Sequence, residues 1–284
     1  MKIFVAGASG VIGRLLVPQL VQDGHEVIGM TRNVERTPQI QASGAKAIVV
    51  DAFDREGIMS ALLDIKPDVV IHQLTSLSNW NLEENSKIRR EGTRHLVDAA
   101  HAAGVKRMIA QSIAWAYEPG EGPAKEEVPL DMAAPLPRKS MIDGILALEG
   151  VVAEIPNHVI LRYGMFYGPG TWYDMDGTVA QKVQSQQLPA TDGVMSFLHV
   201  EDAARAASLA LHWPIGPVNI VDDEPAAGTE WLPVYADALQ SALPEYQEGK
   251  SDWERGASNA KARNEYGWEP LYPTWWSGFA RALK

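Results

Sequence analysis

The sequence predicts an α/β fold with a doubly wound parallel sheet, and three observations support this prediction. The first hundred residues alternate short β-branched runs with longer segments of helical periodicity, as parallel strands joined by crossover helices do. A glycine-rich turn follows the first run directly. With 284 residues and 46% hydrophobic content, the chain can also bury a full core.

The expected strands cover residues 3–6, 26–30, 47–50, 69–72, 107–110, 159–162 and 218–221. Helices fill the intervals, and the one at 92–103 ends before Gly104, a residue suited to releasing the next strand. After about residue 165, prolines, glycines and tryptophans become frequent and the alternation weakens. We therefore expect a first domain at 1–164 and a smaller lobe at 165–284, partly interleaved with it.

The composition of the chain limits the classes of binding partner and of chemistry that are expected. A formal charge of −11 with no local Lys/Arg cluster disfavours nucleic acid and anionic membranes. Cysteine is absent, which excludes disulfides and thiolate chemistry and suits a reducing compartment. The chain begins directly with a strand and has no long apolar stretch, so we expect a soluble, cytoplasmic protein. Its histidines are scattered without paired spacing, so no metal site is expected.

The glycine turn predicts a dinucleotide site. Gly7, Gly10 and Gly13 stand three apart between the first strand and the first helix. Such glycines allow a sharp turn, close approach of a pyrophosphate to the backbone, and close packing of helix on strand. The helix N-terminus then faces the anion. The expected contacts are Gly7, Ser9, Gly10, Val11, Ile12 and Gly13. A tight turn without a ligand is the alternative.

The end of the second strand favours NADP(H) over NAD(H). NAD-preferring proteins often place an acidic residue there, but this chain has Thr31, Arg32 and Asn33. A guanidinium suits a 2′-phosphate, and Thr31 and Asn33 add donors. The alternative is that Arg32 is an ordinary solvated surface residue.

Further cofactor contacts are expected where the third and fourth strands end, namely Asp51, Ala52, Phe53, Gln73 and Leu74. Asp51 is placed to accept from the adenine amine, with Ala52 and Phe53 flanking the ring. Asp54 is equally suited to cap the next helix.

Together with four later segments, these residues resemble the extended short-chain dehydrogenase/reductase superfamily, specifically the NAD-dependent epimerase/dehydratase family. The segments are 91–100 before the fifth strand, 161–170 resembling LRxxxxYGPG, 197–204 resembling FxHVxDxA, and 262–270 resembling xRxxLGWxP. The resemblance spans nearly the whole chain. It implies a Rossmann dinucleotide-binding domain, a C-terminal substrate-binding lobe, and a Ser/Thr-Tyr-Lys group that moves a proton while nicotinamide moves a hydride.

The Tyr-Lys pair of the family is not found. Aligning Glu149 with the family's downstream acid places Met141 at the Tyr position and Ile145 at the Lys position, and neither can transfer a proton. Lys139 is close by, but its Tyr partner would have to be Pro135. The pattern at 246–250 is a literal match that we interpret as coincidence.

The catalytic hydroxyl of the family is also displaced. Counting back from Tyr117 places Ile113 at its position, and a shift of one residue places Ser112 there. We expect Ser112 to face the nicotinamide as a catalytic and cofactor-contacting residue, with a strand-end cap as the alternative. Tyr163 is the second catalytic candidate, and Tyr117 or water are further substitutes.

The substrate is expected to be weakly charged. Met195 occupies a position where sugar-nucleotide members often carry a diphosphate-binding Arg. Trp115, Tyr167 and Trp172 are the expected substrate contacts, with ordinary core packing as the alternative.

Two functions follow. The first is an oxidoreductase or epimerase-like enzyme that transfers hydride between NADP(H) and a small carbonyl or alcohol. The second is a catalytically silent NADP(H)-binding sensor or regulatory protein. Beyond a small-molecule substrate, a homodimer is left open as a partner.

Overall fold

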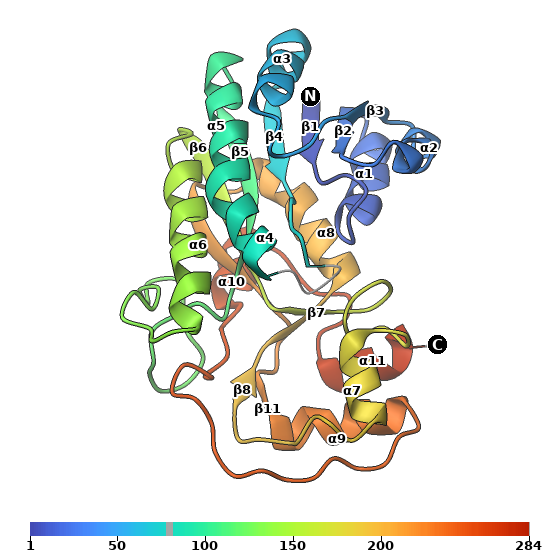
Figure 1. Ribbon diagram of the computed structural model, residues 1–284, viewed down its shortest axis with the longest axis vertical. Helices are drawn as coiled ribbons and strands as arrows, with labels where there is room; N and C mark the ends of the chain where they lie inside the picture. The colour runs from blue at the N-terminus through green and yellow to red at the C-terminus, as the bar shows by residue number, and fades with distance from the viewer. Residues whose placement is uncertain (78–81, 284) are drawn as a thin grey trace. The chain divides into compact units, whose positions relative to one another are not determined.

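The computed structural model describes residues 1–77 and 82–283, and its main feature is a seven-stranded sheet of order β10-β6-β5-β4-β1-β2-β3 (Figure 1). The strands are β1 (Lys2–Ala6), β2 (Glu26–Thr31), β3 (Lys46–Val49), β4 (Val69–His72), β5 (Arg107–Ile113), β6 (Asn157–Tyr163) and β10 (Gly216–Ile220). Strand β1 pairs in parallel with β2 and β4, and the pairs β2–β3 and β4–β5 are also parallel. The strand order reverses at β1, which confirms the predicted doubly wound α/β fold.

The helices between these strands are α1 (Gly13–Gln22), α2 (Thr37–Ala42), α3 (Arg55–Ile65), α4 (Leu82–Lys87), α5 (Thr93–Ala102), α6 (Arg138–Val152) and α8 (Val200–Leu209). Short 3-10 turns cover Val34–Arg36 and Ala210–His212, and a π-helical turn covers Ile88–Gly92. Helix α5 ends as predicted, because Gly104 has φ +77° and its N–H donates to the carbonyl of His101. Strand β5 is longer than predicted, so Ser112 lies within it.

The chain forms two compact units. The first contains residues 1–112, 132–161 and 204–217, and the second contains 113–131, 162–203 and 218–284. Residues 113–131 of the predicted first domain thus belong to the second unit, and residues 204–217 belong to the first.

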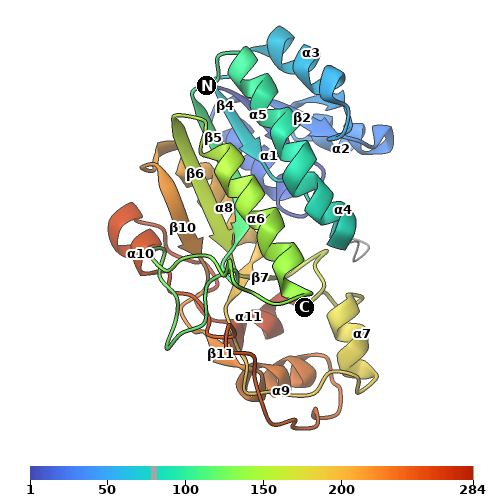
Figure 2. The ribbon, with the colours of Figure 1, turned by 60° about the vertical axis from the view of Figure 1, so that its left-hand side comes forward.

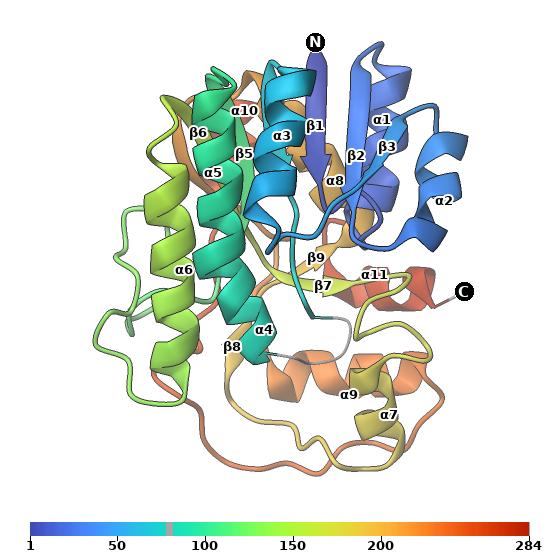
Figure 3. The same cartoon turned by 45° about the horizontal axis from the view of Figure 1, so that its top comes forward.

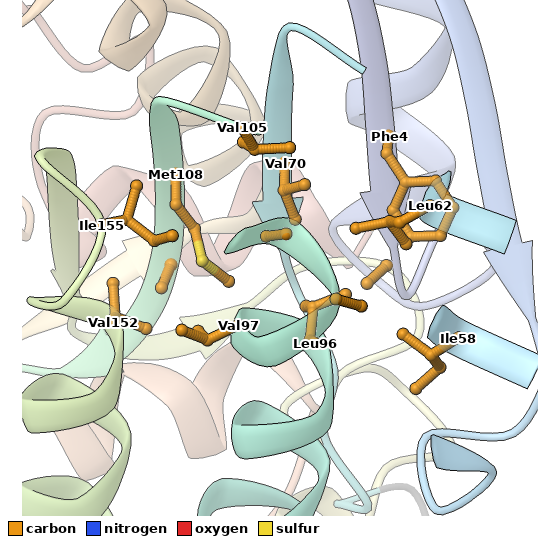
Figure 4. Packing of buried hydrophobic residues seen from close by; sticks show 14 of the residues in the cluster. Phe4, Ile58, Leu62, Val70, Leu96, Val97, Val105, Met108, Val152 and Ile155 are labelled. Atoms are coloured by element: carbon orange, nitrogen blue, oxygen red, sulfur yellow. The ribbon is translucent and has the colours of Figure 1, made fainter. Parts of the chain in front are cut away.

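One face of the sheet in the first unit packs against α3, α5 and α6, which lie in a row (Figure 2). Side chains alternate along β1, so Phe4 points to these helices whereas Ile3 and Val5 are buried on the other face, where α1 lies (Figure 3). Figure 4 shows Phe4, Val70 and Met108 of the strands against the apolar residues of α3 and α5. Burial of this apolar surface, at about 25 cal/mol per Å², stabilises the scaffold that carries the glycine turn.

The second unit is built around aromatic side chains. Its elements are β7 (Met165–Tyr167), β8 (Val194–Met195), β9 (Phe197–His199), β11 (Ala226–Ala227), α7 (Thr178–Gln184), α9 (Gly228–Ala238), α10 (Ala260–Tyr266) and α11 (Trp275–Ala282). Helices α7, α9 and α11 surround a core that includes Tyr173, Phe197 and Phe279 (Figure 3). The ring centroids of Tyr173 and Phe197 are 5.6 Å apart in an edge-on contact.

Two buried carboxylates hold the C-terminal segment of the second unit. Asp202 accepts hydrogen bonds from the N–H groups of Leu271 (2.6 Å) and Tyr272 (2.9 Å), and Asp222 accepts one from Trp275 (2.8 Å). Among the helices that the structure describes, none combines the length and the apolar character needed to cross a membrane.

Candidate functional site

The glycine turn is packed too closely for side chains. Gly7 has φ +92°, and a Cβ on it would lie 2.6 Å from the carbonyl oxygen of Gln73. A Cβ on Gly13 would lie 2.6 Å from the carbonyl oxygen of Ala8. The N–H of Gly10 donates to the carbonyl of Gly7 across the turn (3.0 Å). No side chain caps α1, so the amides at its N-terminus suit an anion such as a pyrophosphate.

The turn is joined to the end of β2 through side chains. The hydroxyl oxygens of Ser9 and Thr31 are 2.9 Å apart, in hydrogen-bond contact. Arg32 is exposed and its guanidinium forms a 2.7 Å ion pair with Glu84. Asn33 accepts a hydrogen bond from the N–H of Glu35 (2.8 Å) and so caps the short helical turn that follows. A 2′-phosphate at Arg32 would therefore compete with a carboxylate that the sequence did not reveal.

Residues 51–54 form a compact turn after β3. Asp51 accepts a hydrogen bond from the N–H of Phe53 (2.8 Å), and Ala52 is buried. The ammonium of Lys87 lies 4.5 Å from the centroid of the Phe53 ring. Asp54 accepts from the N–H of Gly57 (2.9 Å) at the start of α3, which confirms its predicted role as a helix cap.

Gln73, directly after β4, is the least satisfied polar side chain beside the turn. It is 5% exposed, and among the described residues neither its amide nitrogen nor its amide oxygen has a hydrogen-bond partner. Leaving a buried amide unpaired costs about 1–3 kcal/mol per group, which a ligand with a donor and an acceptor would offset. The residues present at this turn therefore fit a dinucleotide.

His72 and Leu74 flank Gln73. The N–H of Leu74 donates to Nδ1 of His72 (3.2 Å), and Nε2 of His72 lies 2.8 Å from the hydroxyl of Thr93. Complete burial, with a smaller contribution from the charge of Arg89, lowers the pKa of His72 to about 4. His72 is therefore neutral at physiological pH and acts as a fixed hydrogen-bonding group.

Ser112 is engaged with Glu149. Its hydroxyl donates to a carboxylate oxygen of Glu149 on α6 at 2.7 Å, and both side chains are buried. Ser112 lies one residue before the end of β5, and its hydroxyl bonds a side chain of α6. Glu149 was not among the residues predicted for the site, although an acid on the otherwise apolar buried face of α6 indicates a polar partner.

Helix α6 carries no tyrosine, and its one lysine is Lys139. The ammonium of Lys139 forms a 2.8 Å ion pair with Asp143 on the exposed side of the helix. Ile145 is fully buried, and Met141 is partly exposed.

The two tyrosines considered as proton donors have structural partners in the second unit. The hydroxyl of Tyr163 donates to the carbonyl of Ala203 (3.2 Å). The hydroxyl of Tyr117 donates to the side-chain oxygen of Asn219 (2.5 Å) and accepts from Arg162 (3.0 Å). Both tyrosines are buried.

The second unit also contains a small, mainly apolar pocket of about 90 Å³. Residues from four segments of the chain line it, and they include Trp115, Met165, Val194, Met195, Trp253 and Arg255. The sequence indicated Trp115 and Met195 but missed Trp253 and Arg255, because no local pattern links residue 253 to residues 115 and 195.

Two predicted substrate contacts lie elsewhere in the second unit. Tyr167 is fully buried in the aromatic core, where desolvation raises the pKa of its phenol, and Trp172 packs against the same core. Within the described residues, no three His, Asp or Glu side chains gather as a metal site would require.

Comparison with known proteins agrees with this geometry. A family model described as NAD(P)H-binding matches residues 7–192. The 3-diazoavenalumate denitrifying reductase of a Streptomyces species is 39% identical over 307 aligned residues, covering 99% of this chain and 100% of that protein. The 2-alkyl-3-oxoalkanoate reductase of Stenotrophomonas maltophilia is 29% identical, covering 74% of this chain and 65% of that protein.

Among solved structures, the UDP-glucose 4-epimerase of Thermus thermophilus in complex with NAD superposes with a TM-score of 0.76 at 24% identity. The match covers 99% of this chain and 97% of the epimerase, which establishes the common fold. The glycine turn, the sheet order and the family match together support binding of a pyridine nucleotide. The chain therefore belongs to the NAD(P)H-binding family.

Proposed function

We propose that the protein is an NADPH-dependent reductase that replaces the nitrogen of a diazo compound with hydrogen. The overall reaction is R–N₂⁺ + NADPH → R–H + N₂ + NADP⁺. A C–H bond forms with the electron pair of the hydride, and the C–N bond breaks with its pair leaving on dinitrogen. Support comes from the Streptomyces relative, whose name describes a denitrifying reduction of a diazo substrate and whose whole length aligns with this chain.

The observation that carries the proposal is that α6 contains no tyrosine. A carbonyl reductase must deliver a proton to the new alcohol oxygen, and in this superfamily a tyrosine assisted by a lysine does so. We infer that Met141 and Ile145 occupy those two positions. Release of dinitrogen needs no proton on oxygen, so a diazo substrate makes the pair dispensable. The bonding of Ser112 to Glu149 agrees with this, because that hydroxyl is already committed.

The residues of the chain then bind, orient and exclude water. Nicotinamide, when bound, supplies the hydride. The backbone from Gly7 to Gly13 is proposed to hold the pyrophosphate, and Gln73 to supply a donor and an acceptor. Arg32 is proposed to contact the 2′-phosphate, since no acid occupies residues 31–33, and this is the basis for preferring NADP(H).

We assign the pocket of the second unit to the substrate. Its lining by Trp115, Met165 and Trp253 suits a flat apolar group. An apolar lining also keeps water away from a carbon that loses dinitrogen, where water would otherwise compete with hydride and give an alcohol.

Stoichiometry tests this function. Purified protein is mixed with NADPH and an aryl diazonium salt, while absorbance follows the cofactor and membrane-inlet mass spectrometry follows dinitrogen. We expect one N₂ per NADPH consumed and no turnover with a panel of ketones. A Gly13→Val protein measures the direct reaction between diazonium and NADPH.

The competing function is carbonyl reduction, which the 29% identical 2-alkyl-3-oxoalkanoate reductase favours. Turnover of 3-oxoacids without any N₂ from the diazonium would establish it and overturn the proposal. Tight NADPH binding with turnover of neither substrate class would instead support a silent sensor.

A further inference from the structure

Arg255 lies on a segment that forms backbone hydrogen bonds with two other segments of the second unit. On one side, Val194 and Arg255 form a parallel bridge, and the N–H of Val194 donates to the carbonyl of Glu254 (3.2 Å). On the other side, the N–H of Ala124 donates to the carbonyl of Gly256 (3.0 Å). The backbone of Arg255 is thereby fixed beside the pocket that its side chain helps to line.

The guanidinium of Arg255 is directed at backbone carbonyls. Its Nε–H donates to the carbonyl of Gly122 (2.7 Å), Nη2 donates to Glu121 (2.7 Å), and Nη1 donates to Glu118 (3.3 Å). Gly120 faces the same group, and a Cβ built there would collide with Nη1. Glycine at position 120 therefore allows the planar guanidinium to enter the turn of the loop.

The loop that contacts the Arg255 side chain begins and ends at residues paired by backbone hydrogen bonds. The N–H of Glu118 donates to the carbonyl of Pro129 (3.0 Å), and the N–H of Asp131 donates to the carbonyl of Ala116 (2.9 Å). Within the part of the chain that the structure describes, Arg255 makes the only hydrogen bonds between residues 119–123 and the rest of the protein. The position of this tip therefore depends on one side chain.

We infer that Arg255 is a positioning residue that holds residues 118–122 in place beside the pocket, and that it does not bind an anionic group of the substrate. Three of the five N–H groups of the guanidinium, one on each nitrogen, donate to backbone carbonyls, and this orients the group toward the loop. The pocket is left to Trp115, Trp253 and other apolar side chains, so it selects an uncharged aromatic portion of the substrate. The selectivity half of this inference rests on the proposed function, whereas the loop half does not.

The loop half is tested by hydrogen exchange, which needs no substrate. Amide exchange in peptides covering 118–124 is compared in wild type, Arg255→Lys, Gly120→Ala and Lys125→Ala. Arg255→Lys keeps the positive charge but removes the planar guanidinium with its several N–H donors. Gly120→Ala keeps the arginine but displaces its guanidinium. Both should raise the exchange rate about tenfold, in line with loss of hydrogen bonds to a charged donor. Lys125→Ala removes a cation from the same loop and should leave exchange unchanged.

The selectivity half uses steady-state kinetics with two aryl diazonium salts, one neutral on the ring and one carrying a carboxylate. Arg255→Lys and Gly120→Ala should raise KM about tenfold for both salts, with kcat within about twofold. A KM increase confined to the carboxylate salt in Arg255→Lys, with Gly120→Ala like wild type, would show an anion contact and overturn the inference. Unchanged exchange in both variants would also overturn it. If wild type turns over neither salt, the proposed function fails while the exchange result still decides the role of Arg255.

Discussion

The glycine turn at residues 7–13 and helix α6 are the two regions in which proteins resembling this chain bind the nucleotide and carry the Tyr-Lys pair. In this chain, the features expected of the first region are present, and those expected of the second are absent. At the turn, Gly7 and Gly13 leave no room for a Cβ. On α6, Met141 and Ile145 offer no proton, and the nearby Ser112 is paired with Glu149. The proposed function accounts for this difference, because a reaction that needs hydride alone would use the nucleotide-binding turn and would not use a proton relay.

The largest expected effect comes from filling the turn. Gly13→Val places a side chain against the carbonyls of Gly7 and Ala8, so the backbone must move away from the pyrophosphate position. We expect NADPH affinity to fall about a thousandfold, or about 4 kcal/mol, by calorimetry. Gly150→Ala, at a position with open space around it, is the control and should bind like wild type. Retained affinity in a folded Gly13→Val protein would refute the assigned cofactor site.

The next effect is the pH dependence of the free energy of unfolding, which arises beside the glycine turn. Burial lowers the pKa of His72 beside the turn to about 4, so the unfolded chain, with a pKa near 6.5, binds the proton more readily. The stabilisation is therefore present above pH 6.5 and is lost as the pH falls towards 4, by about 3 kcal/mol. Urea unfolding at pH 7.5 and 4.5 measures it, and His72→Gln should reduce the difference.

The α6 region should show no matching dependence in catalysis, because it provides no titrating tyrosine. We expect kcat with a diazonium salt to be flat from pH 6.5 to 9. A bell-shaped kcat profile would reveal a proton donor and would place this chain with the ordinary carbonyl reductases.

A smaller effect tests Ser112. If its hydroxyl serves Glu149 only, Ser112→Ala should reduce the free energy of unfolding by about 1–3 kcal/mol, because a buried carboxylate loses a donor. The value of kcat should change by less than about threefold. Thermal unfolding and single-turnover rates separate the two. A hundredfold loss of kcat with unchanged stability would return Ser112 to a catalytic role.

The smallest effects concern the 2′-phosphate. Arg32→Ala should weaken NADPH binding about tenfold and leave NADH binding unchanged, since one charge-assisted contact is lost. Glu84→Gln removes the carboxylate that pairs with Arg32 and should strengthen NADPH binding about two- to threefold. Equal losses for both nucleotides in Arg32→Ala would argue against NADP(H) preference.

The parts of the fold that depend on short-range rules were predictable. Short β-branched runs located the strands, Gly104 indicated the end of α5, and Asp54 was recognised as suited to cap α3, because each depends on residues close together in the chain. The pairing of Ser112 with Glu149 joins residues 37 apart, and that of Arg32 with Glu84 joins residues 52 apart. Local spacing contains no information about such pairs.

The pocket was the least predictable part for the same reason. Trp115, Met195 and Trp253 come together only because three segments meet in the second unit. Tyr167 has the same aromatic character as these residues but is placed in the core, against Gly278. Residue type alone therefore did not distinguish a pocket wall from core packing.

Isotope tracing tests the central claim most directly. The reaction is run with NADPH deuterated at the transferred position, and separately with ordinary NADPH in D₂O, and the R–H product is analysed by mass spectrometry. Hydride replacement without a proton relay predicts one deuterium from the labelled cofactor, at the carbon that carried nitrogen, and none from the solvent. Deuterium entering that carbon from D₂O, or none from the cofactor, would contradict the account.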